Sequence, residues 1–116
     1  MQSVLDAFRR CVAEAIAGDR DYSEQFIIVG RPDLWLQLSW DYFNLALPHE
    51  SVPELGTIPN GVGIEALEPR KFLTLSHSAD DAEVLCDFLI KAAEACWQVA
   101  IGPDALVKVQ EREHRV

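Results

Sequence analysis

The sequence predicts an α+β fold, with an antiparallel sheet of about four to five strands flanked by an N-terminal helix and a long C-terminal helix in two layers. Two features of the hydrophobic pattern carry this prediction. Apolar residues recur at three- and four-residue spacing near both ends of the chain, whereas apolar and polar residues alternate in its middle. The 116 residues indicate a single domain over 1–116, with a short strand and a frayed, charged tail expected over 105–116.

The first helix has a predicted start and a predicted end. Ser3 suits an N-cap, and the carboxylate of Asp6 suits the positive end of the helix dipole. Gly18 is typical of the residue that follows a helix. Between them runs one apolar stripe, made of Val4, Leu5, Phe8, Val12, Ala15 and Ile16.

Two strands are predicted next, Gln25–Val29 and the segment LWLQLSWD, joined by a turn at GRPD. The second strand alternates with period two, so its residues divide between two faces. Leu34, Leu36, Leu38 and Trp40 share one face, and Trp35, Gln37, Ser39 and Asp41 share the other. We therefore expect Trp40 in the core and Trp35 on the opposite face, which meets water or a partner in a two-layer fold.

The remaining elements follow in order. The segment YFNLALP is either a third strand or a bent continuation of the second, and 49–61 is a polar connection with room for one short helical turn. A hairpin is expected over 62–78. The long closing helix is expected to begin at Ser78 and to end before Gly102-Pro103. Its stripe is Leu85, Phe88, Leu89, Ala92, Cys96 and Val99.

Charge and composition limit the partners. Ten Lys and Arg residues against 19 Asp and Glu residues give a formal charge of −9, which disfavours nucleic acid and anionic membranes. The same charge fits a basic partner or simple solubility. No apolar run is long enough to span a membrane, and the N-terminus does not resemble a signal peptide. Three cysteines without a paired motif indicate reduced thiols in the cytoplasm, and we expect no metal or cofactor.

Three places in the sequence are candidates for catalytic, cation-binding or redox chemistry. His77, between two serines, is either a base for a nearby hydroxyl or a solvated residue beside a helix cap. The acids Asp80, Asp81 and Glu83 either hold a cation or stabilise a helix start, and the second reading is favoured. Cys86 lies off the centre of the apolar stripe of its helix, so it is either a reachable thiol with a redox role or a buried, inert thiol.

Surface aromatic residues give the main functional prediction. Trp35 and Tyr42, with Gln37 beside them, and Trp97 at the side of the helix stripe are candidates for binding another protein. The alternative is that these amphipathic rings cover a sheet edge or a loop.

The order of elements, the ELG at Glu54–Gly56 and the SADDA at Ser78–Ala82 resemble the secretion-chaperone-like superfamily. This group contains the type III secretion chaperones and their YbjN-like and TY-chaperone relatives. The resemblance covers roughly Ser3 to Ala100 and implies a non-enzymatic domain, often a homodimer, that binds a partner polypeptide. The chain departs from that pattern in lacking a clear short helix between its strands.

The leading hypothesis is a non-enzymatic protein-binding domain, chaperone-like or adaptor, that holds a partner through a sheet face or groove. One alternative is an immunity-type inhibitor of a basic toxin, and another is a small-ligand or enzyme domain that uses His77. A third is a structural subunit that covers its aromatic surface by self-association.

Overall fold

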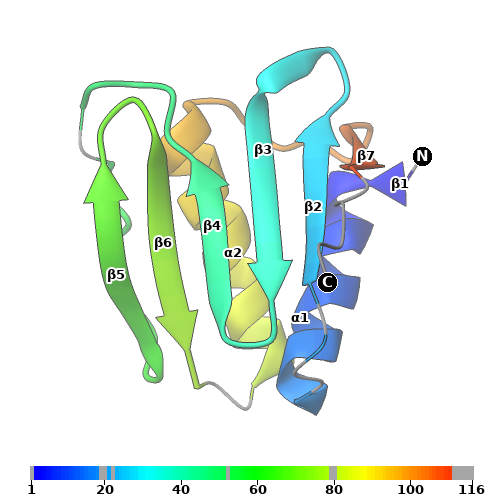
Figure 1. The fold of residues 1–116 in the computed structure, drawn as a ribbon, viewed down its shortest axis with the longest axis vertical. Helices are drawn as coiled ribbons and strands as arrows, with labels where there is room; N and C mark the ends of the chain where they lie inside the picture. Colours follow the sequence, from blue (N-terminus) through cyan, green and yellow to red (C-terminus); the bar gives the residue numbers. More distant parts are fainter. Residues whose placement is uncertain (1, 19–20, 22, 52, 79–80, 111–116) are drawn as a thin grey trace.

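The computed structural model describes residues 2–18, 21, 23–51, 53–78 and 81–110. In these residues seven antiparallel strands form one sheet, and two helices lie behind it (Figure 1). The strand order across the sheet is β1-β7-β2-β3-β4-β6-β5. The elements in chain order are β1 (Gln2–Ser3), α1 (Val4–Ala17), β2 (Ser23–Ile28), β3 (Arg31–Ser39), β4 (Tyr42–Ala46), β5 (Val62–Glu68), β6 (Phe72–His77), α2 (Ala82–Trp97) and β7 (Leu106–Gln110).

The predicted fold with four to five strands and a long closing helix is wrong, because the sheet has seven strands within the described residues. Two strands extend it beyond β2. The two-residue strand β1 pairs with β7, and β7 pairs with β2, so the two ends of the chain meet at one edge. A two-residue strand has no periodicity of its own. The backbone of Val4 also donates to the carbonyl of Ala105 at 2.8 Å, which holds α1 beside this edge.

The start of α2 also differs from the prediction. The helix begins at Ala82, and Asp81 rather than Ser78 is its N-cap. The Asp81 carboxylate accepts hydrogen bonds from the backbone of Glu83 and Val84 at 3.1 and 3.2 Å. Both residue types cap helices well, so sequence alone does not choose between them. Residues 79 and 80 of the expected first turn lie outside the described residues.

The first helix is held by the caps that the sequence predicts. The Ser3 hydroxyl accepts from the backbone of Asp6 at 3.1 Å, and Gly18 adopts the left-handed conformation with φ of 81°. On its outer side, Arg10 donates two hydrogen bonds of 2.8 and 2.7 Å to the carboxylate of Glu24 on β2. This bidentate pair fixes α1 against β2.

The hydrophobic core lies between the sheet and the two helices. Alternate residues of the central strands face it, which leaves the other face of the sheet free of helices (Figure 1). The largest fully buried side chains there are Trp97, Phe8, Phe26, Phe43, Leu34, Leu36, Leu38, Leu45, Leu47, Leu73, Leu75 and Leu85. All three cysteines are free thiols and are buried, including Cys86.

Trp40 does not take the core position expected for it. Strand β3 ends at Ser39, so Trp40 lies in the turn before β4 and is half-buried. The alternation that places Leu34, Leu36 and Leu38 inside stops one residue before this tryptophan reaches the core.

Strand β5 is an edge of the sheet and contains a bulge. Ile64 pairs with Leu75 and Ala66 with Thr74, so Glu65 is an extra residue in the strand register, although its carboxylate accepts a hydrogen bond from Ser76 on β6 at 2.8 Å. A bulge of this kind bends a strand and interrupts its regular pairing.

Neither described helix is both long and apolar enough to cross a membrane.

Candidate binding surface

Twelve residues form the face of the central sheet that the helices leave uncovered, and we call this set the open face. They come from four strands, β2, β3, β4 and β6, and the register arranges them in three rows across the strands. The apolar row is Ile27, Trp35, Ala46 and Phe72; the amide row is Gln25, Gln37, Asn44 and Thr74; the hydroxyl row is Ser23, Ser39, Tyr42 and Ser76.

The amide row is a continuous chain of side-chain hydrogen bonds. The Thr74 hydroxyl donates to Asn44 Oδ1 at 2.6 Å, and Asn44 Nδ2 donates to Gln37 Oε1 at 3.2 Å. Gln37 Nε2 then donates to Gln25 Oε1 at 3.0 Å. All bonds run in one direction across four strands. Such a chain fixes side-chain rotamers, because the amides of Asn44 and Gln37 are each held by both neighbours.

The apolar row presents two large side chains on either side of a small one. Trp35 is half-buried and packs against the edge of the core, and Phe72 lies two strands away. Ala46 lies between them in the row and is only 1% exposed. The two rings therefore shield the alanine and form an apolar surface over it.

The hydroxyl row lies beside a hollow of about 230 Å³, lined by Ser23, Gln37, Leu38, Ser39, Tyr42, Asn44 and Thr74. Ser39 donates to the carbonyl of Tyr42 at 3.0 Å and accepts from its backbone N–H at 3.3 Å, which tightens the turn between β3 and β4. The Tyr42 side chain is 44% exposed. A polar hollow therefore lies next to a projecting aromatic ring.

No charged residue occupies the twelve positions of the open face, but charged residues border it, and the carboxylate of Glu65 on β5 accepts a 2.8 Å hydrogen bond from Ser76 of the hydroxyl row. On one side of the open face, Lys108 of β7 pairs with Ile27 of β2. On the other side, Glu68 of β5 pairs with Phe72 of β6. Beyond the apolar row, Arg31 donates hydrogen bonds of 3.1 and 3.0 Å to Asp33. These bonds raise the pKa of Arg31 and lower the pKa of Asp33.

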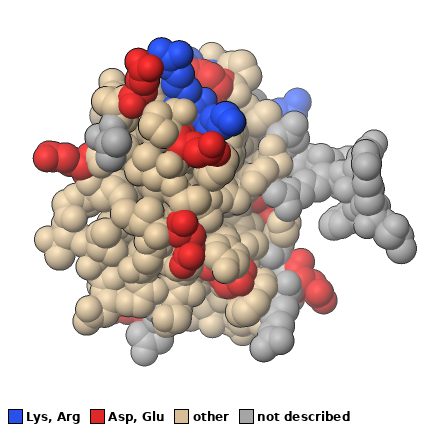
Figure 2. Space-filling model, turned by 60° about the vertical axis from the view of Figure 1, so that its left-hand side comes forward, with Lys and Arg blue, Asp and Glu red and all other residues tan. Residues whose placement is uncertain are grey.

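Figure 2 shows the same distribution from the side of β5. Acidic side chains are scattered over a largely uncharged surface, and basic side chains gather at the upper end beside acidic ones. At the turn between β5 and β6, Arg70 lies 3.1 Å from Glu50 and Lys71 lies 3.8 Å from Glu68. These bases are thus partly neutralised, and they do not form a positive patch.

The structure brings three of the four predicted binding residues together. Trp35, Gln37 and Tyr42 lie in the three neighbouring rows of the open face. Trp97 lies elsewhere, in the core, with 2% of its surface exposed. The loop at His49 lies against this end of α2, because His49 Nε2 is 3.3 Å from the carbonyl of Trp97 and Gln98 Nε2 donates to the Ser51 hydroxyl at 3.3 Å.

Nine of the twelve residues of the open face were not among the predicted binding residues, and three of these nine, Gln25, Asn44 and Thr74, complete the amide row with Gln37. Each is polar and lies at a strand position where alternation places it opposite the core. Their mutual hydrogen bonds depend on register, which the sequence does not reveal. Polar residues in phase on successive predicted strands were the available signal.

His77, the alternative catalytic residue, lies on the helix side of the sheet. Its ring stacks on Phe43, with centroids 4.5 Å apart and an angle of 11° between planes. Neither ring nitrogen makes a hydrogen bond of normal geometry to the described residues, although the Trp40 backbone lies near enough to favour protonation. Burial nevertheless lowers the pKa of His77. The geometry gives this histidine a packing contact with the core.

The acidic residues around the start of α2 are also accounted for in part. Asp81 is the N-cap, Glu83 lies in the first turn, and Asp80 is outside the described residues. No three His, Cys, Asp or Glu side chains within the described ranges gather as a metal site requires.

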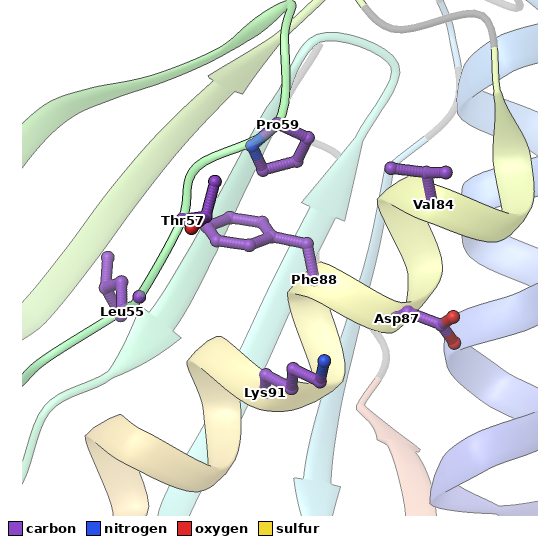
Figure 3. A pocket seen from close by; sticks show the side chains of 8 residues that line it. Leu55, Thr57, Pro59, Val84, Asp87, Phe88 and Lys91 are labelled. Atoms are coloured by element: carbon purple, nitrogen blue, oxygen red, sulfur yellow. The ribbon is translucent and has the colours of Figure 1, made fainter.

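A second hollow, of about 430 Å³, lies on the helix side between α2 and the connection before β5 (Figure 3). Phe88 points from α2 toward Thr57 and Pro59, and Leu55 lies further along the connection. Phe88 is buried and belongs to the core. Val84, also on the wall of this hollow, is 50% exposed.

No family model, curated protein or solved structure matches this chain. The resemblance to the secretion-chaperone-like superfamily therefore remains a prediction.

Proposed function

We propose that this chain is a protein-binding domain of the cytoplasm that buries its open face against another polypeptide. The observation that carries the proposal is the composition of this face: twelve neighbouring positions without one charged residue, in a chain with a formal charge of −9. Charged residues are depleted at the centres of protein interfaces, where aromatic residues are enriched. The buried, free thiols of all three cysteines support a reducing compartment.

The hydrogen-bonded amide row supports binding because it is ordered before a partner arrives. Binding costs free energy when side chains lose freedom, and this loss is smaller where rotamers are already fixed. Gln37 and Asn44 each use one N–H and one carbonyl lone pair within the chain of bonds. A primary amide has two N–H groups and its oxygen has two lone pairs, so Gln37 and Asn44 retain further bonding capacity.

Trp35 and Tyr42 supply the aromatic surface on either side of the amide row. An exposed phenol combines apolar area with a hydrogen-bonding group, as is typical of residues that dominate interface energies. We infer that the partner covers both rings and contacts the amides between them.

The test uses a library of phage-displayed peptides and protein immobilised so sparsely that two copies cannot meet. Tyr42→Glu places a charge on the open face, and Val84→Glu places the same charge at a similarly exposed position on α2. Peptides selected on the wild type are expected to bind Val84→Glu normally and Tyr42→Glu at least about tenfold more weakly. Circular dichroism checks that both variants are folded.

A second readout locates the peptide. Binding is expected to shift the side-chain amide resonances of Gln37 and Asn44 in nuclear magnetic resonance spectra. Peptides that bind both variants equally and leave these resonances unchanged would overturn the proposal. Loss of binding in Val84→Glu alone would move the site to the α2 hollow.

A further inference from the structure

We propose that the partner of the open face is a second copy of this chain, packed face to face about a twofold axis that runs parallel to the strands between β3 and β4. This inference rests on the proposed function and names the occupant of the same surface. The starting point is charge. Two copies that each carry −9 repel one another, so they associate best through a surface without charge, and the open face is such a surface.

The axis determines which residues meet. A half-turn about a line parallel to the strands turns the sheet over and reverses the strand order, but it keeps each row opposite the same row. Strand β3 then lies over β4 of the second copy, β2 lies over β6, and β7 lies over β5. Two sheets packed in this way keep their strands nearly aligned, as in a β-sandwich.

The apolar rows of the two copies meet under this operation. Trp35 of one copy lies over the position of Ala46 in the other, and Ile27 lies over Phe72. Because Trp35 and Phe72 of its own copy cover Ala46, which is 1% exposed, the contact is between the aromatic rings of the two copies. Burying these rings against one another removes apolar surface from water.

The edges of the same row carry opposite charges. Lys108 continues the row beyond Ile27 on β7, and Glu68 continues it beyond Phe72 on β5. The half-turn places Lys108 of each copy near Glu68 of the other. Two intermolecular ion pairs therefore flank the uncharged centre, each sharing Glu68 with Lys71 of its own copy, which lies 3.8 Å away, and they favour this register of the two sheets.

The hydroxyl row supplies a projection and a hollow. Under the same operation the exposed ring of Tyr42 lies over Ser39 of the other copy, and Ser39 lines the 230 Å³ hollow. A cavity of about 150 Å³ accommodates a benzene ring, so the hollow has room for the phenol. The polar lining by Ser23 and Gln37 suits its hydroxyl group.

A twofold axis across the strands gives a poorer match. It would lay the apolar row over the hydroxyl row, so that Trp35 and Phe72 would cover serine hydroxyls. It would also remove Lys108 from Glu68. Burying hydroxyl groups under apolar rings without hydrogen bonds is unfavourable.

The size of the contact indicates a reversible dimer. The four strands of the open face, about 4.8 Å apart, and its three rows of side chains cover roughly 400 Å² per copy, below the roughly 800 Å² of a standard interface. We therefore expect a dissociation constant in the micromolar range.

Sedimentation equilibrium over a range of concentrations tests the proposal. The wild type and Val84→Glu are expected to dimerise with the same dissociation constant, and Tyr42→Glu is expected to dimerise at least about tenfold more weakly. If the wild type stays monomeric at a protein concentration about 100 times the expected micromolar dissociation constant, the proposal that the partner is a second copy is overturned. That outcome leaves the proposed function standing if selected peptides still distinguish Tyr42→Glu from Val84→Glu.

Charge exchange tests the axis. Lys108→Glu and Glu68→Lys each place like charges at both edges of the contact, and each is expected to weaken its own dimer about three- to tenfold. Mixing the two variants brings opposite charges together at both edges, so a heterodimer of near wild-type affinity is expected. A mixture no tighter than the separate variants overturns the axis parallel to the strands. A dimer that Val84→Glu dissociates and Tyr42→Glu leaves intact overturns the proposal as a whole.

Discussion

The hydroxyl of Thr74 donates a 2.6 Å hydrogen bond to the side-chain carbonyl of Asn44, from β6 to the neighbouring strand β4. This bond is the start of the chain that continues through Gln37 to Gln25. In this arrangement the Asn44 oxygen faces Thr74 and the Asn44 nitrogen faces Gln37. The hydrogen bonds of the row therefore all point from Thr74 toward Gln25.

Asn44→Leu is expected to lower the free energy of unfolding by about 1–2 kcal/mol, because it leaves both Thr74 and Gln37 without a partner in the row. Urea denaturation measures the change. Ser76→Ala is the control, since it removes one exposed bond, from Ser76 to Glu65, and is expected to cost less than about 1 kcal/mol. Equal costs for both variants would contradict the central role of the row.

Trp97→Ala is expected to lower the free energy of unfolding by about 3–5 kcal/mol, because it opens a large cavity in the core. Trp35→Ala removes a ring that is only half-buried, so its cost should be under about 2 kcal/mol. Guanidinium denaturation of the two variants gives the comparison. The opposite order would mean that Trp35, and not Trp97, belongs to the core.

Stability is expected to fall as the pH drops below about 6.5, the ordinary pKa of histidine in an unfolded chain. Burial holds the pKa of folded His77 lower than this value, so the unfolded state binds more protons between the two pKa values. Above both values the ring is neutral in each state and its contribution is constant. His77→Phe retains a ring against Phe43 and removes this titration.

The measurement is the free energy of unfolding from about pH 7 to about pH 5, for the wild type and His77→Phe side by side. The variant should lose less stability over this interval. Identical pH dependences would show that protonation of His77 does not oppose folding.

The three cysteines are expected to react slowly with a thiol reagent such as dithionitrobenzoate while the protein is folded. All three are buried, and burial raises the pKa of Cys96 to about 11 and also raises the pKa of Cys86. The reactive thiolate is therefore scarce at neutral pH. Unfolding in guanidinium should release all three thiols. Val84→Cys places a thiol at an exposed position and is the control, which should react at once. Rapid labelling of the folded wild type would contradict the burial of the three cysteines.

The parts of the fold that the sequence predicts are those with local signals. Capping residues predict both ends of α1, and the alternation in β3 separates Leu36 from its neighbours Trp35 and Gln37. These signals depend on residues close together in the chain. They place Trp35, Gln37 and Tyr42 opposite the core without knowledge of the strand order.

The parts that sequence does not predict depend on distant contacts. Strand β1 exists because β7 comes back beside it, and the contact of the His49 loop with the end of α2 joins residues 48 positions apart. The hydrogen bonds of the amide row need three pairs of strands in the correct register. Neither loop packing nor register has a signature within one segment, so these features emerge only in the assembled sheet.

The bulge at Glu65 has a consequence for how this protein avoids polymerising. A regular edge strand invites another strand to add beside it, and each addition exposes a new edge, so growth has no natural end. The extra residue in β5 disturbs that edge and adds a negative charge to it, while β1 at the opposite edge is only two residues long. Growth in the plane of the sheet is thus discouraged at both sides. A contact through the face, related by a half-turn, is complete once two molecules have met.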